Sequence, residues 1–411
     1  MRHRGVRVAA ALCAGVLVAG LTVSAASAET GAQSGGGGGA KKTIIIGALG
    51  PFFDVNTGTR SPEWPAAVKA RVKAFNKANE LPGYTLKVFE CDTGLDPNQT
   101  EKCARDGVDK GIVASVGFNG TTGANLLPIL EGASIPAVGP IPVDPTETTN
   151  PVSFPLTSGI PGAFEALPVA IGNAGATKQS LVLSDIGAAT AIAELFVQAS
   201  VKRQGYELGA TVRVPPDIAD FAPIVASATQ DDPQGISSFV IGPPAATFIK
   251  QVRSSGFDGP ISAGSAFLSQ KLINELGSDA NGLLVPSLLA WQKSKGGKQF
   301  NQEMKKYAKG EVLNDVAANY WMSTWIVGEQ LKAIVKGGGT PDATSLLAAM
   351  GKLSGYSTQG LTPPITTTKP VVVESPIPFE RFYNQTVVPF AVKKGKLVQT
   401  STKFIDPFKK Q

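Results

Sequence analysis

Residues 84–123 switch between strand-like and helix-like patterns within a short distance. The segment predicts a strand, an acidic turn, a helix, a second strand and then a polar loop rich in glycine and threonine. Similar alternation starts at the apolar run 43–49, TIIIGAL, which is typical of a central parallel strand buried on both faces. Repeated strand–helix alternation predicts an α/β fold in which helices flank a parallel sheet.

The alternation forms two series, separated by the proline-rich residues 140–161. Two series predict two Rossmann-like lobes. The first predicts strands at 43–49, 84–90, 112–117 and 135–139, with helices at 64–75, 98–110 and 123–132. The second predicts strands at 180–185, 208–214, 236–242 and 260–264, with helices at 161–174, 188–204, 221–231 and 245–256. Longer helices at 297–309 and 315–336 and a hairpin at 381–400 complete the pattern.

The first 28 residues have the pattern of a secretory signal peptide. Three arginines precede the apolar run 8–23, and Ala26-Ser27-Ala28 is a small-x-small cleavage site. The run is too short and too early for a convincing transmembrane helix. We therefore expect cleavage after Ala28, a flexible glycine-rich linker over 29–42, and a secreted or extracytoplasmic protein.

The three cysteines bear on the cellular compartment in which the protein is expected to lie. Acylation of Cys13 would give a lipoprotein, but Leu12 is a poor small residue before it and few apolar residues precede it. The mature chain then keeps only Cys91 and Cys103. In an oxidising compartment we expect a disulfide between them, which closes a loop of about a dozen residues and contributes on the order of 3 kcal/mol. The alternative is two free buried thiols.

Composition excludes several classes of protein. His3 is the only histidine and lies in the signal peptide, so the mature chain has no histidine triad and no histidine-ligated zinc site. The whole chain has 38 basic and 32 acidic residues, and the mature chain is more nearly balanced, which argues against a nucleic-acid partner. No G-x-S-x-G or S-x-x-K framework stands in a fitting context. We expect no enzymatic activity, catalytic residue, cofactor or metal site.

Short motifs in a fixed order carry a resemblance to one family. They are Ile44–Pro51, Glu90-Cys91-Asp92, Asp96-Pro97, Cys103-Ala104-Arg105, Val116-Gly117, Ser134–Val138 and Ser184-Asp185. The ordered series resembles type I periplasmic substrate-binding proteins of the branched-chain amino-acid kind, the leucine-binding-protein-like family found with ABC transporters. The likeness runs from about residue 42 to near the C-terminus and is weaker after residue 291.

This resemblance implies an architecture of two α/β lobes joined by a three-crossover hinge. The crossovers would lie near 155–160, 285–291 and 360–376. The N-terminal lobe would comprise 43–157 and about 286–360, and the C-terminal lobe 158–285 and about 361–411. The resemblance also implies a disulfide in the N-terminal lobe, at Cys91 and Cys103. Lobes of this kind bind ligands at the carboxyl ends of their strands and close around them.

The loop that follows the strand 112–117 is the first candidate ligand site. The resemblance implies that its hydroxyl and backbone N–H groups bind a ligand carboxylate. Its residues favour the same role, because threonine hydroxyls, a close backbone approach at glycine and a following helix N-terminus form an anion site. The candidates are Asn119, Gly120, Thr121 and Thr122. The alternative is that Thr122 is simply the N-cap of the helix.

Further ligand contacts are implied at other strand ends. In the first lobe they are Gly139 and Ile141, together with Phe52 and Phe53 as apolar walls. Phe267 of the second lobe could supply a further apolar wall, and the alternative for all three phenylalanines is core packing or a surface flap. In the second lobe they are Asp185, Ala189, Gly242, Ser265 and Phe267. The alternative for Asp185 is a cap on the following helix.

Several of these loops depart from the family's pattern. Val143 stands where a hydroxyl is usual, alanine stands after Asp185 where a tyrosine is usual, and the loop 264–267 has no acid. A buried ammonium group without a carboxylate or several oxygens carries a heavy desolvation cost. We therefore expect a less polar carboxylate, an amide or an aromatic acid as ligand, rather than a free α-amino acid.

The expected function is extracytoplasmic solute binding. The protein would capture a small polar or carboxylate-bearing ligand, an amino acid or a related compound, between two lobes for import by an ABC transporter. The alternative is a secreted ligand sensor or scavenger of the same fold without a transporter. The expected partners are the small-molecule ligand and an ABC permease, with no nucleic acid, and we expect a monomer.

Overall fold

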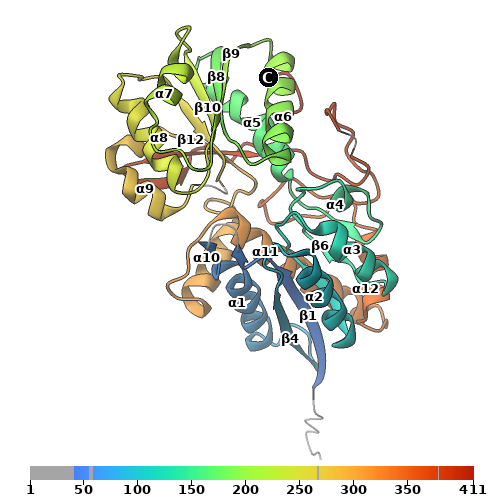
Figure 1. The fold of residues 1–411 in the computed structure, drawn as a ribbon. Coiled ribbons are helices and arrows are strands. Elements are labelled where there is room, and N and C mark those ends of the chain that lie inside the picture. The colour runs from blue at the N-terminus through green and yellow to red at the C-terminus, as the bar shows by residue number, and fades with distance from the viewer. Residues whose placement is uncertain (1–40, 55–58, 266–267, 378) are drawn as a thin grey trace, which may run out of the picture. The chain divides into compact units, whose positions relative to one another are not determined.

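The computed structural model describes residues 41–54, 59–265, 268–377 and 379–411. Lys41–Gln411 form one compact unit. Its strands make two large sheets and one two-stranded ribbon, and helices flank the sheets (Figure 1). The predicted two-lobe α/β fold is confirmed. The signal peptide, its cleavage site, most of the linker and Phe267 lie outside the described residues.

The first sheet contains five parallel strands in the order β4-β1-β5-β6-β7. They are β1 (Lys42–Gly50), β4 (Tyr84–Asp92), β5 (Ile112–Val116), β6 (Ala137–Val138) and β7 (Ser153–Phe154). Strand β1 lies between β4 and β5, with Ile46 opposite Val88 and Gly47 opposite Ser115. Its residues are buried from Ile46 to Gly50, as the apolar run predicts.

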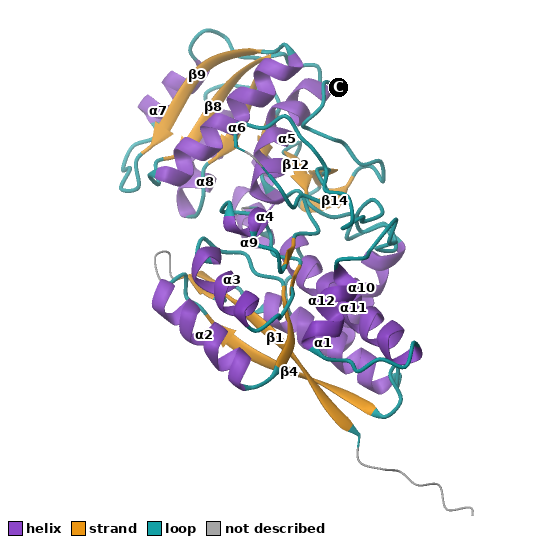
Figure 2. Ribbon diagram, turned by 90° about the vertical axis from the view of Figure 1, so that its right-hand side faces the viewer, coloured by secondary structure: helices purple, strands orange, loops and turns teal. Residues whose placement is uncertain are grey.

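Helices cover both faces of the first sheet, as Figure 2 shows. One group is α1 (Glu63–Lys77), α10 (Lys295–Tyr307), α11 (Asp315–Lys336) and α12 (Ala343–Met350), and the other is α2 (Pro97–Asp109) and α3 (Gly123–Gly132). Alternate residues of β1 belong to different cores, since Ile46 packs in one apolar cluster and Leu49 in another. The period of two along a strand therefore divides the buried surface between the two helical layers.

The second sheet has seven strands in the order β14-β13-β12-β11-β10-β8-β9. Five are parallel: β8 (Lys178–Ser184), β9 (Glu207–Val214), β10 (Gly235–Phe239), β11 (Ile261–Ala263) and β12 (Leu284–Ser287). The predicted hairpin is confirmed as β13 (Val388–Lys393) and β14 (Lys396–Gln399); β13 pairs antiparallel with β12, and β14 pairs antiparallel with β13 at the edge of the sheet. Gly395 has a φ of +69° at the turn, a conformation that suits glycine.

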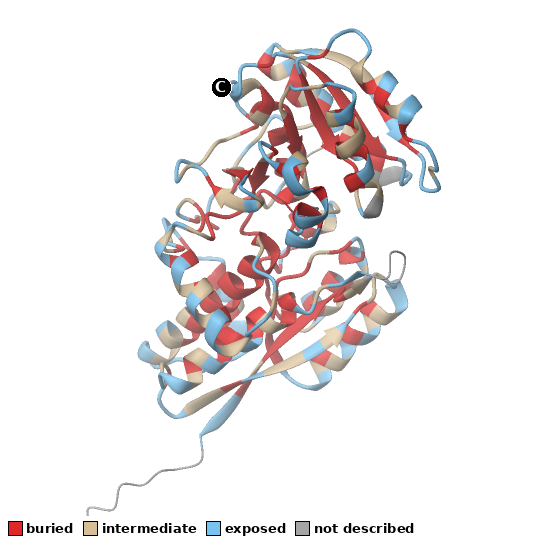
Figure 3. Ribbon diagram, turned by 90° about the vertical axis from the view of Figure 1, so that its left-hand side faces the viewer, coloured by how far each residue is buried: buried red, intermediate tan, exposed pale blue. Residues whose placement is uncertain are grey.

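The second sheet also carries helices on its faces. They are α5 (Gly159–Asn173), α6 (Ala188–Gln204), α7 (Ala222–Thr229), α8 (Pro243–Ser254), α9 (Gln270–Leu276) and the 3₁₀ turn η2 (Gly277–Ala280). Buried residues concentrate on the strands of both sheets (Figure 3). Among the described residues, no helix has the length and apolar character that a membrane crossing requires.

Several short elements have no counterpart in the sequence-based prediction. They are the ribbon of β2 (Phe53–Asp54) and β3 (Thr59–Arg60), strand β7, and helices α4 (Thr146–Thr149), α9 and α12. Elements of two to eight residues are too short to show a clear helical or strand period. Their formation depends on contacts with the larger elements that precede and follow them.

The segment after α12 is bound to that helix by hydrogen bonds. Thr367 donates from its hydroxyl to the Met350 carbonyl at 2.5 Å, and its backbone N–H donates to the Leu353 carbonyl at 2.9 Å. An isolated bridge pairs Tyr356 with Ile365. The boundaries of the two lobes remain a prediction, and these contacts favour a third crossover that begins after residue 367.

Candidate functional site

The candidate residues of the first lobe lie on loops at the carboxyl edge of the first sheet. Two hydrogen bonds join these loops: Ile141 N–H donates to the Phe118 carbonyl at 2.8 Å, and Thr93 N–H donates to the Gly50 carbonyl at 2.9 Å. The loops after β1, β4, β5 and β6 are thus connected in pairs. Parallel strands bring all their carboxyl ends to one edge, which is why residues so distant in sequence meet here.

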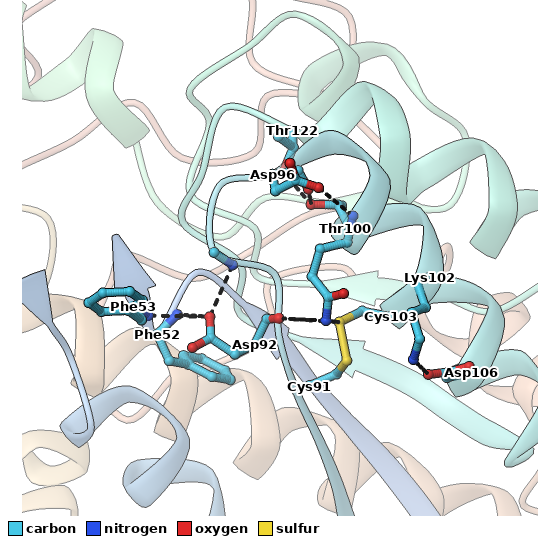
Figure 4. Close-up of a disulfide and its surroundings, with 12 residues drawn as sticks. Phe52, Phe53, Cys91, Asp92, Asp96, Thr100, Lys102, Cys103, Asp106 and Thr122 are labelled. Atoms are coloured by element: carbon cyan, nitrogen blue, oxygen red, sulfur yellow. Dashed lines mark hydrogen bonds and ion pairs between the residues drawn. A yellow bond between two sulfur atoms is a disulfide. The ribbon is translucent and has the colours of Figure 1, made fainter. Parts of the chain in front are cut away.

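Asp92, at the end of β4, holds the loop that carries the two phenylalanines (Figure 4). Its Oδ1 accepts hydrogen bonds from the backbone N–H groups of Phe52 at 2.9 Å and Phe53 at 3.2 Å. The same oxygen accepts from Gly94 N–H at 3.0 Å. One carboxyl oxygen that accepts from three backbone N–H groups is a strong local anchor. It fixes the backbone of the apolar loop relative to β4.

The two phenylalanines have different surroundings. Phe52 is 7% exposed and packs edge-to-face on Tyr320, with ring centroids 6.1 Å apart. Phe53 is half-buried, and the Arg60 guanidinium lies 4.5 Å from its ring centroid. Phe52 therefore contributes to the core, which was the alternative to a ligand contact, whereas Phe53 keeps part of its ring accessible.

The predicted disulfide is confirmed between Cys91 and Cys103, with Cα atoms 5.6 Å apart. It joins the end of β4 to the middle of α2 (Figure 4). Three residues before Cys103, the buried Thr100 hydroxyl lies 2.9 Å from that of Thr122. The disulfide-linked helix therefore supports the candidate loop after β5.

This contact decides the local role of Thr122. Its hydroxyl interacts with Thr100 and makes no capping hydrogen bond to α3. The Thr122 carbonyl instead accepts from Asn125 and Leu126 N–H groups, at 3.0 and 3.2 Å. Thr122 is buried, whereas Thr121 is exposed and Asn119 is half-buried. Thr121 and Asn119 are thus the members of this loop whose polar groups are accessible.

Close packing fixes the path of the loop after β5. A Cβ added to Gly120 would lie 3.1 Å from Leu95 Cδ2 and 3.2 Å from Pro51 Cγ, so the glycine allows three loops to approach. Phe118 is buried and has a φ of 113°, which is unusual for a residue with a side chain. Backbone strain of this kind persists only where the surroundings impose it, and it is concentrated at functional sites.

Tyr320 of α11 lies beneath the loops. Its ring stacks on Trp64, with centroids 6.0 Å apart and planes inclined by 15°. A Cβ on Gly117 would lie 2.2 Å from the Tyr320 ring, so only glycine fits there. Complete burial raises the pKa of Tyr320, and the nearby N–H groups of Phe118 and Asn119 offset this only partly. The hydroxyl therefore remains neutral, and it is the packing of the Tyr320 ring that supports the loops above it.

Two carboxylates lie behind the N-terminus of α3. Glu147 is fully buried, and its Oε2 accepts from Val143 N–H at 2.5 Å and Asp144 N–H at 3.1 Å. A Cβ on Gly123 would lie 2.9 Å from Asp144 Oδ2 and 3.0 Å from Glu147 Oε1. Burial and the charge of Asp144 raise the pKa of Glu147 well above its usual range. The raised pKa favours the protonated, neutral form of Glu147 beside the N-terminus of α3.

Gly139 joins the loop after β6 to α11. Its carbonyl accepts from Asn319 Nδ2 at 2.7 Å, and a Cβ at this position would overlap Ser323 Oγ. Ile141, two residues later, is 1% exposed. Its side chain therefore belongs to the core in this structure, and its backbone N–H is occupied by Phe118.

The candidate residues of the second lobe follow β8, β10 and β11. Asp185 is exposed and does not cap α6, whose N-cap is Gly187. Ala189 lies in the first turn of α6, and Gly242 is the N-cap of α8 with a φ of 70°. Ser184 Oγ accepts from Ile241 N–H at 3.1 Å, which joins the loops after β8 and β10.

Ser265 is the second-lobe candidate with a direct contact to a helix of the first lobe. It is 7% exposed, and its hydroxyl donates to Asp315 Oδ2 at the start of α11. Two surface hollows, of about 440 and 410 Å³, lie elsewhere and include none of the candidate residues. The assignment of the candidate residues to a ligand remains a prediction.

Sequence reasoning did not assign a site role to Asp92, Asp315, Asn319 or Tyr320. Asp92 belongs to the motif Glu90-Cys91-Asp92, which is the available signal for it. The other three lie in a helix whose pattern predicts burial without identifying its neighbours. An aspartate is nevertheless unusual among the buried residues of a long apolar helix. Its presence in the first turn of this helix was therefore a sequence signal for a residue with a special role.

Two lobes built on largely parallel sheets, with loops clustered at the carboxyl ends of the parallel strands, define a two-lobe binding protein. The family model described as "Periplasmic binding protein" matches residues 43–371. The chain therefore belongs to the periplasmic binding protein family, a family of extracytoplasmic ligand-binding proteins rather than enzymes.

Solved structures with the same fold include several from bacteria. An extracellular ligand-binding receptor from Verminephrobacter eiseniae has a TM-score of 0.72 and 18% identity, covering 86% of this chain and 99% of that one. The leucine-binding protein LivK of Thermotoga maritima has a TM-score of 0.68 and 18% identity, covering 89% and 99%. LivJ of Streptococcus pneumoniae, solved in complex with isoleucine, has a TM-score of 0.67 and 17% identity, covering 89% and 100%. None of the curated proteins compared with the chain matches it.

Proposed function

We propose that this protein captures a small carboxylate-bearing solute between its two lobes and delivers it to an ABC importer. The loop 119–122 holds the solute's carboxylate at the N-terminus of α3, and Phe53 contributes an apolar surface. The solute is an amino acid or a related compound. The branched-chain amino-acid proteins among the structural neighbours, LivK and LivJ, support this ligand class.

The observation that carries the proposal is the support beneath the loop 119–122. Thr122 is held by Thr100, and Gly120 is packed against Leu95 and Pro51. The Thr121 hydroxyl is left exposed immediately before a ten-residue helix. A fixed backbone, an accessible hydroxyl and a helix N-terminus together favour an anion. Because the loop is held before ligand arrives, little conformational entropy is lost on binding.

The alternative function is a secreted sensor or scavenger with the same fold and no transporter. The two functions share the ligand site and differ in the fate of the captured solute. Uptake of the identified solute by cells from which the gene is deleted separates them. Reduced uptake supports import, and unchanged uptake supports sensing or scavenging.

The direct test of solute binding is thermal unfolding of the mature protein, beginning at Glu29, against a panel of amino acids, carboxylic acids and amides. A solute at 100 times its dissociation constant stabilises the folded state by about 2.7 kcal/mol. We expect stabilisation by at least one carboxylate-bearing class. Absence of any shift across the panel contradicts the proposed function.

The loop is tested by Thr121→Ala, which removes the exposed hydroxyl, and by the double substitution Thr121→Ala with Thr122→Ala. We expect the first to weaken affinity and the second to abolish measurable binding. Thr340→Ala, at an exposed position after α11, is the matched control. Unchanged affinity in the double variant contradicts the assignment of this loop while leaving solute binding itself intact.

A further inference from the structure

Two segments without an acidic residue lie side by side in the second sheet. Residues 280–302 and 381–405 together hold eight basic residues and no aspartate or glutamate, although the whole chain has 38 basic and 32 acidic residues. Strand β12 of the first segment pairs antiparallel with β13 of the second. Beyond β12, Gln292 Nε2 donates to the Leu397 carbonyl at 2.9 Å, and Lys293 N–H donates to Gln399 Oε1 at 2.9 Å. Lysines from both segments are therefore brought to the edge of the sheet that β14 forms.

Most of this positive charge is exposed to solvent. Six lysines form what we call the lysine edge: Lys293, Lys295, Lys298, Lys393, Lys394 and Lys396. All six are exposed, and none takes part in an ion pair within the described part of the chain. The acids that follow the two segments are already engaged, Glu303 with Arg71 at 2.8 Å and Asp406 with Lys409 at 2.9 Å. The lysine edge thus carries positive charge that the described residues leave unbalanced.

Protection of a sheet edge explains only part of this arrangement. Lysine on an edge strand discourages pairing with another chain, and Lys396 on β14 suits that role. Lys295 and Lys298 lie instead in the first turn of α10, where they line a surface hollow of about 440 Å³ together with Gln299 and Gln302. The helix dipole disfavours cations at this end of a helix and favours anions. Two lysines beside a hollow at this position therefore favour a site for an anionic group.

The chemical character of the lysine edge favours a phosphate-rich surface over a protein partner. It contains no arginine, and the exposed large hydrophobic residues of the described chain all lie outside residues 280–302 and 381–405. Protein interfaces are instead enriched in aromatic residues and arginine and depleted in lysine. Lysine ammonium groups are hydrated point charges that respond to charge density rather than to a fixed geometry. Clusters of about four to eight basic residues bind anionic lipid headgroups in this way.

We propose that the lysine edge docks the protein on a membrane surface that contains anionic phospholipid. The headgroup phosphates supply the negative charge that this surface lacks, and the hollow beside Lys295 and Lys298 accepts one of them. None of the candidate solute-binding residues belongs to the lysine edge, so the membrane and the solute can be bound together. Docking keeps the protein close to the membrane whatever the identity of the solute, and it does not depend on the proposed solute capture.

The first test is co-sedimentation of the mature protein with vesicles of phosphatidylcholine, alone or mixed with phosphatidylglycerol. We expect binding to the anionic vesicles to be about tenfold tighter or more. It should weaken about tenfold when sodium chloride rises from about 50 to about 500 mM, because salt screens the lysines. Equal binding to both vesicles overturns the inference. Absence of binding to the anionic vesicles also overturns it, and turns attention to an acidic protein partner. Either result leaves the proposed solute capture intact.

The second test removes the charge in two independent variants. One combines Lys393→Gln, Lys394→Gln and Lys396→Gln, and the other combines Lys293→Gln, Lys295→Gln and Lys298→Gln. We expect each variant to bind the anionic vesicles about tenfold more weakly or less. Unchanged binding in both overturns the inference, and two separate variants keep the test decisive if one of them fails to fold.

A control variant separates the lysine edge from net charge. It combines Lys73→Gln, Lys77→Gln and Lys87→Gln, at three lysines of the first lobe that are exposed and outside the ion pairs of the described residues. It has the same net charge as the two edge variants, and we expect it to bind vesicles as the wild type does. A control that loses as much binding as the edge variants shows an effect of net charge alone and overturns the inference.

Discussion

Asp92, at the end of β4, accepts a hydrogen bond at 2.9 Å from the backbone N–H of Phe52, forty residues earlier in the chain. The bond joins the apolar loop after β1 to the strand that carries Cys91. Through the disulfide and α2, the same strand supports Thr122. Asp92 therefore connects the apolar and polar parts of the candidate site.

The substitution Asp92→Ala removes the acceptor of three backbone N–H groups. We expect the free energy of unfolding to fall by about 2 kcal/mol and the solute to bind more weakly, because the loop of Phe52 and Phe53 loses its anchor. Urea unfolding and titration calorimetry measure the two effects. Asp342→Ala removes a helix cap, costs about 1 kcal/mol and leaves affinity unchanged. An unaltered unfolding midpoint for Asp92→Ala contradicts the role of Asp92.

Alanine substitutions at Gly117 and Gly111 distinguish the cost of a steric clash from the cost of a strained backbone. Both have positive φ, +73° and +70°, but a Cβ on Gly117 meets the Tyr320 ring at 2.2 Å, whereas one on Gly111 meets nothing within 4 Å. We expect Gly111→Ala to cost about 1–2 kcal/mol and Gly117→Ala about 3 kcal/mol more. Chemical denaturation of both variants tests this. Equal costs mean that Tyr320 moves aside freely.

The disulfide is expected to stabilise the fold. Replacing Cys91 and Cys103 together by serine should lower the free energy of unfolding by about 3 kcal/mol, because the unfolded chain regains the freedom of the closed loop. The dithiol form of the wild type should show a similar loss when reductant is added. Reductant should have no effect on the double variant, which makes that protein the control. A double variant as stable as the oxidised wild type disproves the prediction.

The buried carboxyl group of Glu165 should make the stability of the folded protein depend on pH. Its carboxylate is 0% exposed and pairs with Arg203 Nη1 at 2.5 Å. Burial nevertheless raises the pKa of Glu165 from 4.5 to about 7, and the Arg203 hydrogen bond and charge oppose this rise. Between these two values the folded state retains a proton that the unfolded state has lost. Its contribution to stability is therefore complete below about pH 4.5 and is lost as pH rises to about 7.

The variant Glu165→Gln does not titrate and serves as the reference. We expect the stability of the wild type relative to this variant to decline from pH 4.5 to 7 by up to about 1.4 kcal/mol for each pH unit, and then to level off. Urea unfolding at half-unit pH steps measures it. A difference that rises with pH over the same range shows that the ion pair with Arg203 outweighs burial.

The architecture was accessible to sequence reasoning because it depends on local patterns. The apolar run 43–49 predicts a central strand, and β1 is central. The predicted helix 123–132 coincides with α3, and the predicted hairpin turns near Gly395. Cys91 and Cys103 form the expected bond, and they are the only two cysteines in the sequence after residue 28. Each of these features depends on residue type and spacing within a short segment.

Tertiary structure alone decided how the site is assembled. The hydroxyl of Thr122 bonds Thr100 rather than its own helix, and Ser265 meets Asp315, which turns a loop without an acid into a neighbour of one. Such contacts join residues that are far apart in sequence, and no local period encodes them. The sequence by itself determined which segments become strands and helices. Only the packing of the two sheets decided which side chains meet, because burial brings polar groups together and forces them to find partners.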